Sequence, residues 1–353
     1  MSLNIITIED CKEWDRLVKT FKNYDVYYLS GYARAFQLHG DGEPMLFYYE
    51  NKHMRAINVV MKRDISDYPK FSGKIKKDTY FDLINPYGYG GFLFDGNNSV
   101  SNIKLLDDEY IEYCKSNGII SEFTRFHPIL SNSIGLESKY DLLTIGKTIS
   151  IQLNSSEYIL TNLSSQNRNK IRKAEKSGVK IYWGRNIELI DEFINMYNAT
   201  MDRDQANEYY YFKEEFYKSI LYDLKYNFLI FYAVYQGKTI AMSIILFSNK
   251  QMHYYLSASI KEYLTYAPTN LLLYEAACWG ADNGYHTLHL GSGLGGKEDS
   301  LYKFKKSFNK NFDNDFIIGK KIFDEEKYYE LIKIRMEEEI FDENTSFFPI
   351  YRG

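Results

Sequence analysis

Cysteine, proline and tryptophan are scarce in this chain of 353 residues, with three, six and three copies. The cysteines, Cys11, Cys114 and Cys278, lie far apart and form no C-x-x-C pair, which argues against a disulfide framework or a zinc site. No run of about eighteen apolar residues occurs, so no membrane-spanning helix is expected. The N-terminus lacks the basic segment of a signal peptide. We therefore expect a cytoplasmic protein without a bound metal.

The charge is small in total but unevenly distributed. The formal net charge is −4, and hydrophobic and charged residues make up 45% and 25% of the chain, as in an ordinary globular protein. Residues 162–185 nevertheless contain seven basic residues and one acid, Glu175. Acids dominate from 323 to 345 and include Glu337-Glu338-Glu339. The length suits two domains, and the charge pattern adds a basic patch and an acidic helical tail.

The order of predicted elements is similar in the two halves of the chain. Residues 1–150 follow the order helix, helix, three strands, helix and strand. The second half begins with a helix at 156–176, a strand at 179–183 and helices at 187–203 and 211–222. Three strands at 228–235, 238–248 and 251–257 follow, then a helix at 268–283 and a strand at 286–290. This order predicts an α/β fold with a repeated core.

A glycine-rich turn followed by a basic and aromatic segment stands out near the C-terminus. It reads Gly291-Ser-Gly-Leu-Gly-Gly-Lys297 and continues as Leu301-Tyr-Lys-Phe-Lys-Lys-Ser-Phe308. A flexible turn at a strand end, followed by fixed positive charge, suits a site that receives an anion or a developing oxyanion. The same glycines spell G-x-G-x-x-G, but the short remainder of the chain shows no second parallel strand and crossover for a dinucleotide fold.

This segment resembles the C-terminal motif of the Fem-type aminoacyltransferases, which are tandem relatives of the GNAT acyltransferases. Four further segments carry the resemblance: Asp82–Gly91, Arg125–Pro128, Arg168–Lys176 and Phe347–Arg352. The resemblance implies two tandem GNAT-like domains, at 1–150 and 151–323, and a helical acidic tail at 324–353 that packs back on the body. The chain departs from many Fem-type enzymes in one respect, because its residues 150–320 leave no room for an inserted coiled coil.

The resemblance and the local pattern together mark the candidate site residues. They are catalytic Lys305 and Phe304, and substrate-binding Arg203, Tyr302, Gly291, Gly293, Arg168, Arg172 and Tyr87. On a helix Lys305 shares a face with Leu301 and Tyr302, so its ammonium can turn inward and meet a tetrahedral oxyanion. The alternative is a lysine whose stem covers the core while its head reaches water.

The other candidates also have two interpretations each. Arg203 either grips a phosphate or carboxylate of the acceptor or pairs with Asp202, Asp204 or Glu208 at the surface. The basic helix with Arg168 and Arg172 is either a solvated face or a contact to a phosphate-bearing substrate or tRNA. Tyr87, beside a glycine loop, lines a groove between the domains or belongs to a structural turn. His127, His253 and His289 are interpreted as hydrogen-bonded core residues.

Residues 263–272 occupy the place where ordinary GNAT enzymes bind the coenzyme A pyrophosphate on backbone amides. Tyr266 and Pro268 stand where glycines are needed, and proline has no amide donor. We therefore expect no coenzyme A cofactor. Fem-type enzymes also lack this loop, since their donor is aminoacyl-tRNA.

The resulting hypothesis is an acyl or aminoacyl transferase that forms an amide on an amine of a phosphorylated cell-envelope precursor, of the peptidoglycan type. The donor is an aminoacyl-tRNA or another activated acyl compound, and the protein is a monomer or weak dimer. The alternatives are a coenzyme A-dependent GNAT N-acetyltransferase and a catalytically silent binding module of the same fold.

Overall fold

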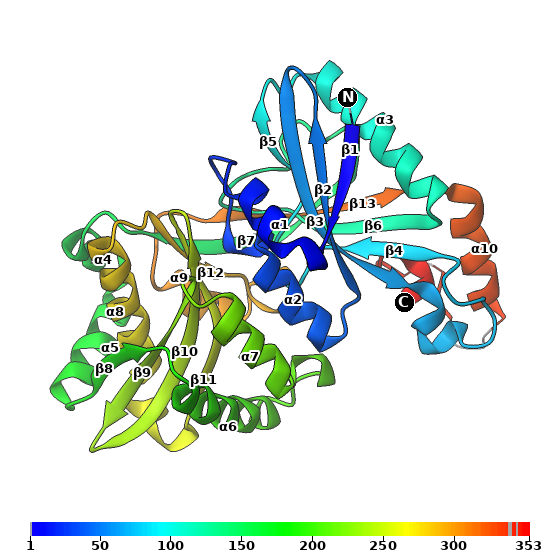
Figure 1. Ribbon diagram of the computed structural model, residues 1–353. Coiled ribbons are helices and arrows are strands. Elements are labelled where there is room, and N and C mark those ends of the chain that lie inside the picture. Colours follow the sequence, from blue (N-terminus) through cyan, green and yellow to red (C-terminus); the bar gives the residue numbers. More distant parts are fainter. Residues whose placement is uncertain (1, 338–340, 344) are drawn as a thin grey trace. The chain divides into compact units, whose positions relative to one another are not determined.

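The computed structural model describes residues 2–337, 341–343 and 345–353, and the chain divides into two compact units (Figure 1). Unit 1 comprises Met1–Thr144 and Phe316–Gly353, and unit 2 comprises Ile145–Asp315. The domain boundary predicted after residue 150 falls inside the strand Asp141–Gln152. The boundary predicted after residue 323 falls just beyond the strand Asn314–Ile322. The C-terminal segment therefore returns to unit 1.

Unit 2 contains a mixed sheet in the order β7-β12-β11-β10-β9-β8. The strands are β7 (Asp141–Gln152), β8 (Lys180–Gly184), β9 (Phe228–Tyr235), β10 (Lys238–Ser248), β11 (Gln251–Ser259) and β12 (Thr287–Gly291). β11 and β12 are parallel, and every other neighbouring pair is antiparallel. β10 is buried from Ile240 to Ser248, as expected of a central strand covered on both faces.

Helices cover both faces of this sheet (Figure 1). They are α4 (Ser156–Asn162), α5 (Ser165–Lys176), α6 (Ile187–Arg203), α7 (Glu214–Asp223), α8 (Pro268–Asp282) and α9 (Ser300–Lys306). Side-chain caps fix where several begin: the Asn186 side chain accepts from the Leu189 amide at 2.9 Å, and the Ser164 hydroxyl accepts from the Asn167 amide at 3.1 Å. The core joins strands β7 to β12 with α5 and α8 through residues such as Ile171.

Unit 1 has a sheet in the order β1-β2-β3-β4-β6-β13, with β5 also paired to β3. The strands are β1 (Ser2–Thr7), β2 (Glu43–Glu50), β3 (Met54–Asp64), β4 (Phe81–Ile84), β5 (Leu93–Gly96), β6 (Ile119–Arg125) and β13 (Asn314–Ile322). The helices are α1 (Cys11–Val18), α2 (Ser30–His39), α3 (Val100–Ser116) and α10 (Glu325–Met336). Only β4 and β6 pair in parallel within the described part of this sheet.

The two units repeat one arrangement. β1 in unit 1 and β8 in unit 2 are each followed by two helices, three antiparallel strands, a helix and a strand parallel to its neighbour. Unit 1 adds β5 before that last helix, and unit 2 places β7, α4 and α5 before β8. This is the core of the GNAT fold, so the predicted tandem α/β architecture is confirmed. Unit 2 is described without gaps, and its longest helix, α6, has 17 residues, which leaves no inserted coiled coil.

Several local predictions were wrong. The helix expected at 156–176 is two helices, because Leu163 and Ser164 adopt extended backbone and Ser164 caps α5. Strands β1, β5, β7 and β13 were not predicted. In the predicted acidic tail, α10 is helical, whereas Glu338 and Glu339 lie outside the described residues. No helix among the described residues is long and apolar enough to span a membrane.

The C-terminus of unit 1 is held by a buried ion cluster on β4. The Asp82 side chain is 1% exposed and pairs with Arg63 at 2.7 Å and with Arg352. Tyr351 donates its hydroxyl to the same carboxylate at 3.2 Å. Burial opposes the ionisation of Asp82, but the two guanidinium groups outweigh it and hold its pKa below the ordinary value.

We expect Arg352→Met to destabilise unit 1 by about 3 kcal/mol, because a buried carboxylate loses one of its two cations. Urea denaturation followed by circular dichroism measures the loss. Arg16→Met, which breaks the exposed Arg16–Glu13 pair, is the matched control and should cost less than about 1 kcal/mol. Equal effects of the two substitutions would contradict this role of Arg352.

Candidate active site

The two parallel strands of unit 2 separate after a short paired stretch. β11 and β12 pair over three rungs that end at His253 and His289, although both strands continue beyond this point. β12 also changes register against β7 between His289 and Gly291. The carboxyl ends of two neighbouring strands thus diverge, and such strand ends are where α/β folds bind ligands.

The glycine turn leaves β12 at this point. Gly291 has a φ of +79°, a conformation that favours glycine. A Cβ added to Gly293 would lie 2.1 Å from the Lys297 carbonyl oxygen, so a larger residue cannot close the turn. Asp299 accepts the Leu294 amide at 2.9 Å and the Tyr302 amide at 2.8 Å. One carboxylate therefore fixes both the turn and the start of α9.

Lys305 turns inward from α9 toward this turn. Its side chain is buried, and its Nζ donates to the Ser292 carbonyl oxygen at 2.6 Å. Ser292 in turn donates its hydroxyl to the Lys147 carbonyl on β7 at 2.7 Å. The ammonium is thus held three residues beyond the last rung of the parallel strands.

Burial is the main influence on the proton affinity of Lys305. Removal from water disfavours the ammonium and lowers the pKa of Lys305 to about 8, with Asp299 acting weakly in the opposite direction. The group is therefore still mostly charged at neutral pH. A buried ammonium at a divergent strand end can stabilise negative charge that develops beside it.

The neighbours of Lys305 on α9 differ from it in burial. Lys303 is exposed, and Lys306 is half-buried and pairs with Asp313 at 3.0 Å. Tyr302 is buried, and burial raises the pKa of its hydroxyl. Phe304 is partly buried against the core of unit 2, with its ring 5.4 Å from that of Phe308. The catalytic roles of Lys305 and Phe304 stay predictions.

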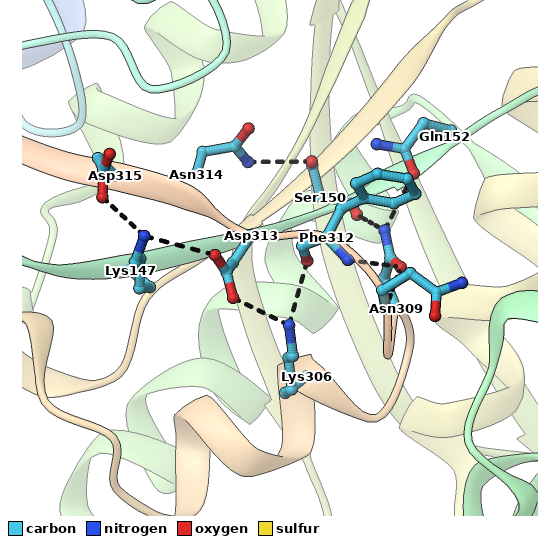
Figure 2. A network of polar contacts seen from close by, with 10 residues as sticks. Lys147, Ser150, Gln152, Lys306, Asn309, Phe312, Asp313, Asn314 and Asp315 are labelled. Carbon is cyan, nitrogen blue, oxygen red and sulfur yellow. Dashed lines mark hydrogen bonds and ion pairs between the residues drawn. The ribbon is translucent and has the colours of Figure 1, made fainter.

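A polar network, which the sequence did not predict, ties the segment after α9 to β7 (Figure 2). Lys147 pairs with Asp315 at 2.8 Å and with Asp313 at 3.6 Å, and Asp313 also pairs with Lys306. Buried Asn309 donates to the Ser150 carbonyl oxygen at 2.7 Å. These contacts join residues far apart in the chain and hold the C-terminal end of α9 in place. Among the contacts described here that hold the glycine turn and α9, only the Asp299 cap has a recognisable local sequence pattern, which is an aspartate before a short helix.

Arg203, at the end of α6, lies at a pocket of about 550 Å³ within unit 2. Its Nη1 donates to the Ser259 carbonyl oxygen at 2.8 Å, and its Nε pairs with Asp204 at 2.9 Å. Lys238 and Lys261 also line the pocket. The expected ion pair with Asp204 is present. The pocket is lined by three cations and by the two acids Glu192 and Glu262, and a role of Arg203 in acceptor binding stays a prediction.

The other sequence-marked residues are dispersed. Arg168 donates to the Leu163 carbonyl oxygen at 2.6 Å and so braces the break between α4 and α5. Arg172 is exposed on α5. Tyr87 lies in unit 1, where its carbonyl oxygen accepts the Tyr32 hydroxyl and its ring lies 6.3 Å from that of Phe36. The substrate-binding roles of these residues stay predictions.

The start of α8 offers few amides to a pyrophosphate. The amides of Ala267 and Asn270 already donate to the Leu264 and Ala267 carbonyl oxygens, and Pro268 has no amide hydrogen. Just before this start, the Tyr266 ring lies 4.6 Å from that of Tyr235. This geometry is unsuited to a standard coenzyme A site.

Comparison with known proteins agrees with this architecture. The sequence matches the family of acetyltransferase (GNAT) domains over residues 162–306. It is 28% identical over 175 residues to the UDP-N-acetylmuramoylpentapeptide-lysine N(6)-alanyltransferase of Weissella viridescens, and the match covers 48% of this chain and 50% of that protein. The chain thus aligns with about half the length of this relative.

Solved structures share the fold over nearly the whole chain. FemX has a TM-score of 0.68 at 14% identity, with 93% of this chain and 99% of FemX covered. The C-terminal domain of a putative lysylphosphatidylglycerol synthetase from Agrobacterium fabrum has a TM-score of 0.57 at 11% identity, with 94% and 97% covered. Together with the alanyltransferase match, these similarities show that the chain has the tandem GNAT fold of FemX.

The burial of Lys305 has a measurable consequence for the stability of the protein. The folded pKa of about 8 lies below the ordinary 10.5, so the unfolded chain binds this proton more tightly. The contribution of Lys305 to the free energy of unfolding should therefore rise between about pH 8 and pH 10.5, by up to about 3 kcal/mol. Lys305→Met should lose this rise, whereas the exposed control Lys303→Met should keep it. Parallel curves for wild type and Lys305→Met in urea titrations would show that Lys305 titrates normally.

Proposed function

We propose that this Fem-type protein is an aminoacyltransferase that forms an amide on an amine of a peptidoglycan-type precursor, with aminoacyl-tRNA as its donor. The observation that carries the proposal is the buried Lys305 ammonium at the turn beyond the separated strands β11 and β12. The Weissella relative acts, by its name, on a muramoylpentapeptide lysine, which supports the acceptor class.

The chemistry requires little from the protein beyond positioning and charge stabilisation. The acceptor amine attacks the carbonyl carbon of the aminoacyl ester, and a tetrahedral oxyanion forms. Collapse of this intermediate breaks the ester C–O bond, and a proton from the amine passes to the departing ribose oxygen. Lys305 stabilises the oxyanion, which exists only during the reaction, so its contribution falls on turnover and not on binding.

A coenzyme A-dependent acetyltransferase is the alternative, and the match to GNAT acetyltransferase domains is the observation that favours it. Purified protein should transfer an amino acid from aminoacyl-tRNA to a UDP-linked muramoylpentapeptide, as followed by mass spectrometry. Acetyl-coenzyme A should neither acetylate this acceptor nor bind with micromolar affinity in calorimetry, because the start of α8 offers few free amides to a pyrophosphate. Micromolar binding with acetyl transfer would favour the acetyltransferase. No turnover with either donor would favour a silent binding module.

Lys305→Met should lower turnover by about 10²-fold or more and leave the binding of donor and acceptor nearly intact, as for loss of an oxyanion donor. The wild-type rate should also fall above about pH 8, where Lys305 loses its proton, and Lys305→Arg should remove that fall. Lys303→Met and Lys306→Met are the matched controls. Near-full turnover of Lys305→Met would assign the catalysis to another group.

Arg203→Ala should weaken binding of the phosphorylated acceptor by about 1.5–3 kcal/mol, the range of a hydrogen bond to a charged group. Calorimetric titration with the UDP-linked precursor measures the change. Asp204→Asn is the control, because it removes the ion-pair partner and leaves the guanidinium at the pocket. If Arg203→Ala leaves the affinity unchanged, the arginine serves only its contacts with Asp204 and the Ser259 carbonyl oxygen.

A further inference from the structure

The carboxylate of Asp299 joins the two parts of unit 2 between which the Lys305 ammonium is held. Its Oδ2 accepts the Leu294 amide of the glycine turn at 2.9 Å, and its Oδ1 accepts the Tyr302 amide of α9 at 2.8 Å. We propose that Asp299 is a positioning residue, which holds the turn against α9 so that the Ser292 carbonyl oxygen lies opposite the ammonium. This inference deepens the proposed function and rests on it for the reaction.

The space that Asp299 occupies explains one glycine of the turn. Gly293 has a φ of −74°, a backbone conformation that any residue adopts, so its conformation does not call for glycine. A Cβ at Gly293 would nevertheless overlap the Asp299 carboxylate. Gly295 is the opposite case, because its φ of +61° favours glycine while a Cβ there would meet no atom within 4 Å. Gly293 is therefore needed for a contact inside the protein.

A second set of contacts holds the turn on β7. The Ser292 hydroxyl donates to the Lys147 carbonyl oxygen at 2.7 Å, and a Cβ at Gly296 would lie 2.6 Å from the Ile145 carbonyl oxygen. These contacts fix the turn to the sheet, whereas the Asp299 contacts fix it to the start of α9. Loss of the carboxylate should therefore leave the turn on the sheet and loosen its register against the helix that carries Lys305.

Asp299 also acts on Lys305 through its charge. Burial lowers the pKa of Lys305 to about 8, and the negative charge of Asp299 opposes this effect. The pKa of Asp299 is itself lowered, mainly by the Tyr302 and Leu294 amides and to a smaller extent by Lys305. The carboxylate thus stays ionised while the lysine titrates, and it favours the charged form of the lysine throughout.

The other charged side chains on the elements around Lys305 are engaged elsewhere or exposed. Lys147 on β7 and Lys306 on α9 both pair with Asp313. Lys297, Glu298 and Lys303 are exposed, and His289 is buried on β12. Of the carboxylates in unit 2, which is described without gaps, Asp299 is the one whose charge raises the pKa of Lys305.

The first test separates this clamp from ordinary helix capping. In Asp299→Asn the remaining side-chain oxygen still caps α9, but the amide nitrogen cannot accept from Leu294 and the charge is lost. Turnover with aminoacyl-tRNA should fall by about tenfold or more while KM stays nearly unchanged, because the ammonium is misplaced and substrate binding is intact. Asp324→Asn, at the cap of α10 where Oδ1 accepts the Lys327 amide at 3.0 Å, is the matched control. Full turnover of Asp299→Asn would overturn the proposal, since a cap would then suffice.

The second test follows the lysine itself and needs no substrate. NMR of protein labelled with ¹³C at the lysine Cε gives the titration midpoint of Lys305, whose signal is the one lost in Lys305→Arg. The midpoint should move to lower pH in Asp299→Asn, because the ammonium loses a neighbouring negative charge, and should stay in place in Asp324→Asn. An unchanged midpoint in Asp299→Asn would show that the carboxylate does not act on Lys305, which contradicts the proposed role.

A double-mutant cycle tests the contact between Gly293 and Asp299. Gly293→Ala should displace the carboxylate and lower turnover about as much as Asp299→Asn, and the double variant should be no slower than either single variant. Gly295→Ala is the control for adding a methyl group to the turn, and it should keep most of the turnover. Fully additive losses of Gly293→Ala and Asp299→Asn would mean that the two positions act independently, and the clamp would be rejected.

The outcomes distinguish this inference from the proposed function. A lowered midpoint in Asp299→Asn, together with no transfer by the wild-type protein from aminoacyl-tRNA, would leave Asp299 as the residue that positions Lys305 and reject the proposed reaction. Wild-type transfer that persists in Asp299→Asn, with an unchanged midpoint, would keep the proposed function and reject the role of Asp299.

Discussion

The contact between the Lys305 ammonium and the Ser292 carbonyl oxygen is the interaction around which the candidate site is built. A buried ammonium is costly unless a polar group faces it, and here that group is a single backbone carbonyl. The cost appears as the lowered pKa of Lys305. A charge that is incompletely satisfied before the reaction interacts more strongly with an oxyanion when one forms, which is the condition for catalysis by differential binding.

This contact depends on structure that is distant in sequence. Asp299 holds the glycine turn and the start of α9, while Asn309, Asp313 and Lys147 hold the segment after the helix against β7. α9 is a helix of only seven residues, too short to be stable alone, so both of its ends are fixed by tertiary contacts. The fixed ends of α9 therefore determine which lysine is buried: Lys305 is, while Lys303 is exposed and Lys306 is ion-paired.

The repeated α/β core could be predicted from the sequence, because the apolar periodicity that distinguishes helices from strands is set by residues only a few positions apart. The sequence also predicted that Lys305 turns inward together with Tyr302, whereas Leu301, which was expected on the same buried face, is exposed. It could not predict β13 or the network with Lys147, because their partners are more than a hundred residues away. The break at Ser164 was missed although serine is a common cap, since Ile159 and Leu163 before it and Ile171 after it keep the spacing of one continuous helix.

The two units show why only one of them is a candidate for chemistry. In unit 1 the parallel strands β4 and β6 stay paired over four rungs, and a bridge between Gly90 and Phe126 continues the pairing. In unit 2 the corresponding strands part after three rungs, and the turn beyond them receives Lys305. Unit 1 instead uses its buried charges for structure: Asp82 anchors Arg352, and Asp107 pairs with Lys139 and Lys321. The same fold thus holds compensated ions beside parallel strands that stay paired in unit 1, and a buried ammonium in the turn beyond parallel strands that part in unit 2.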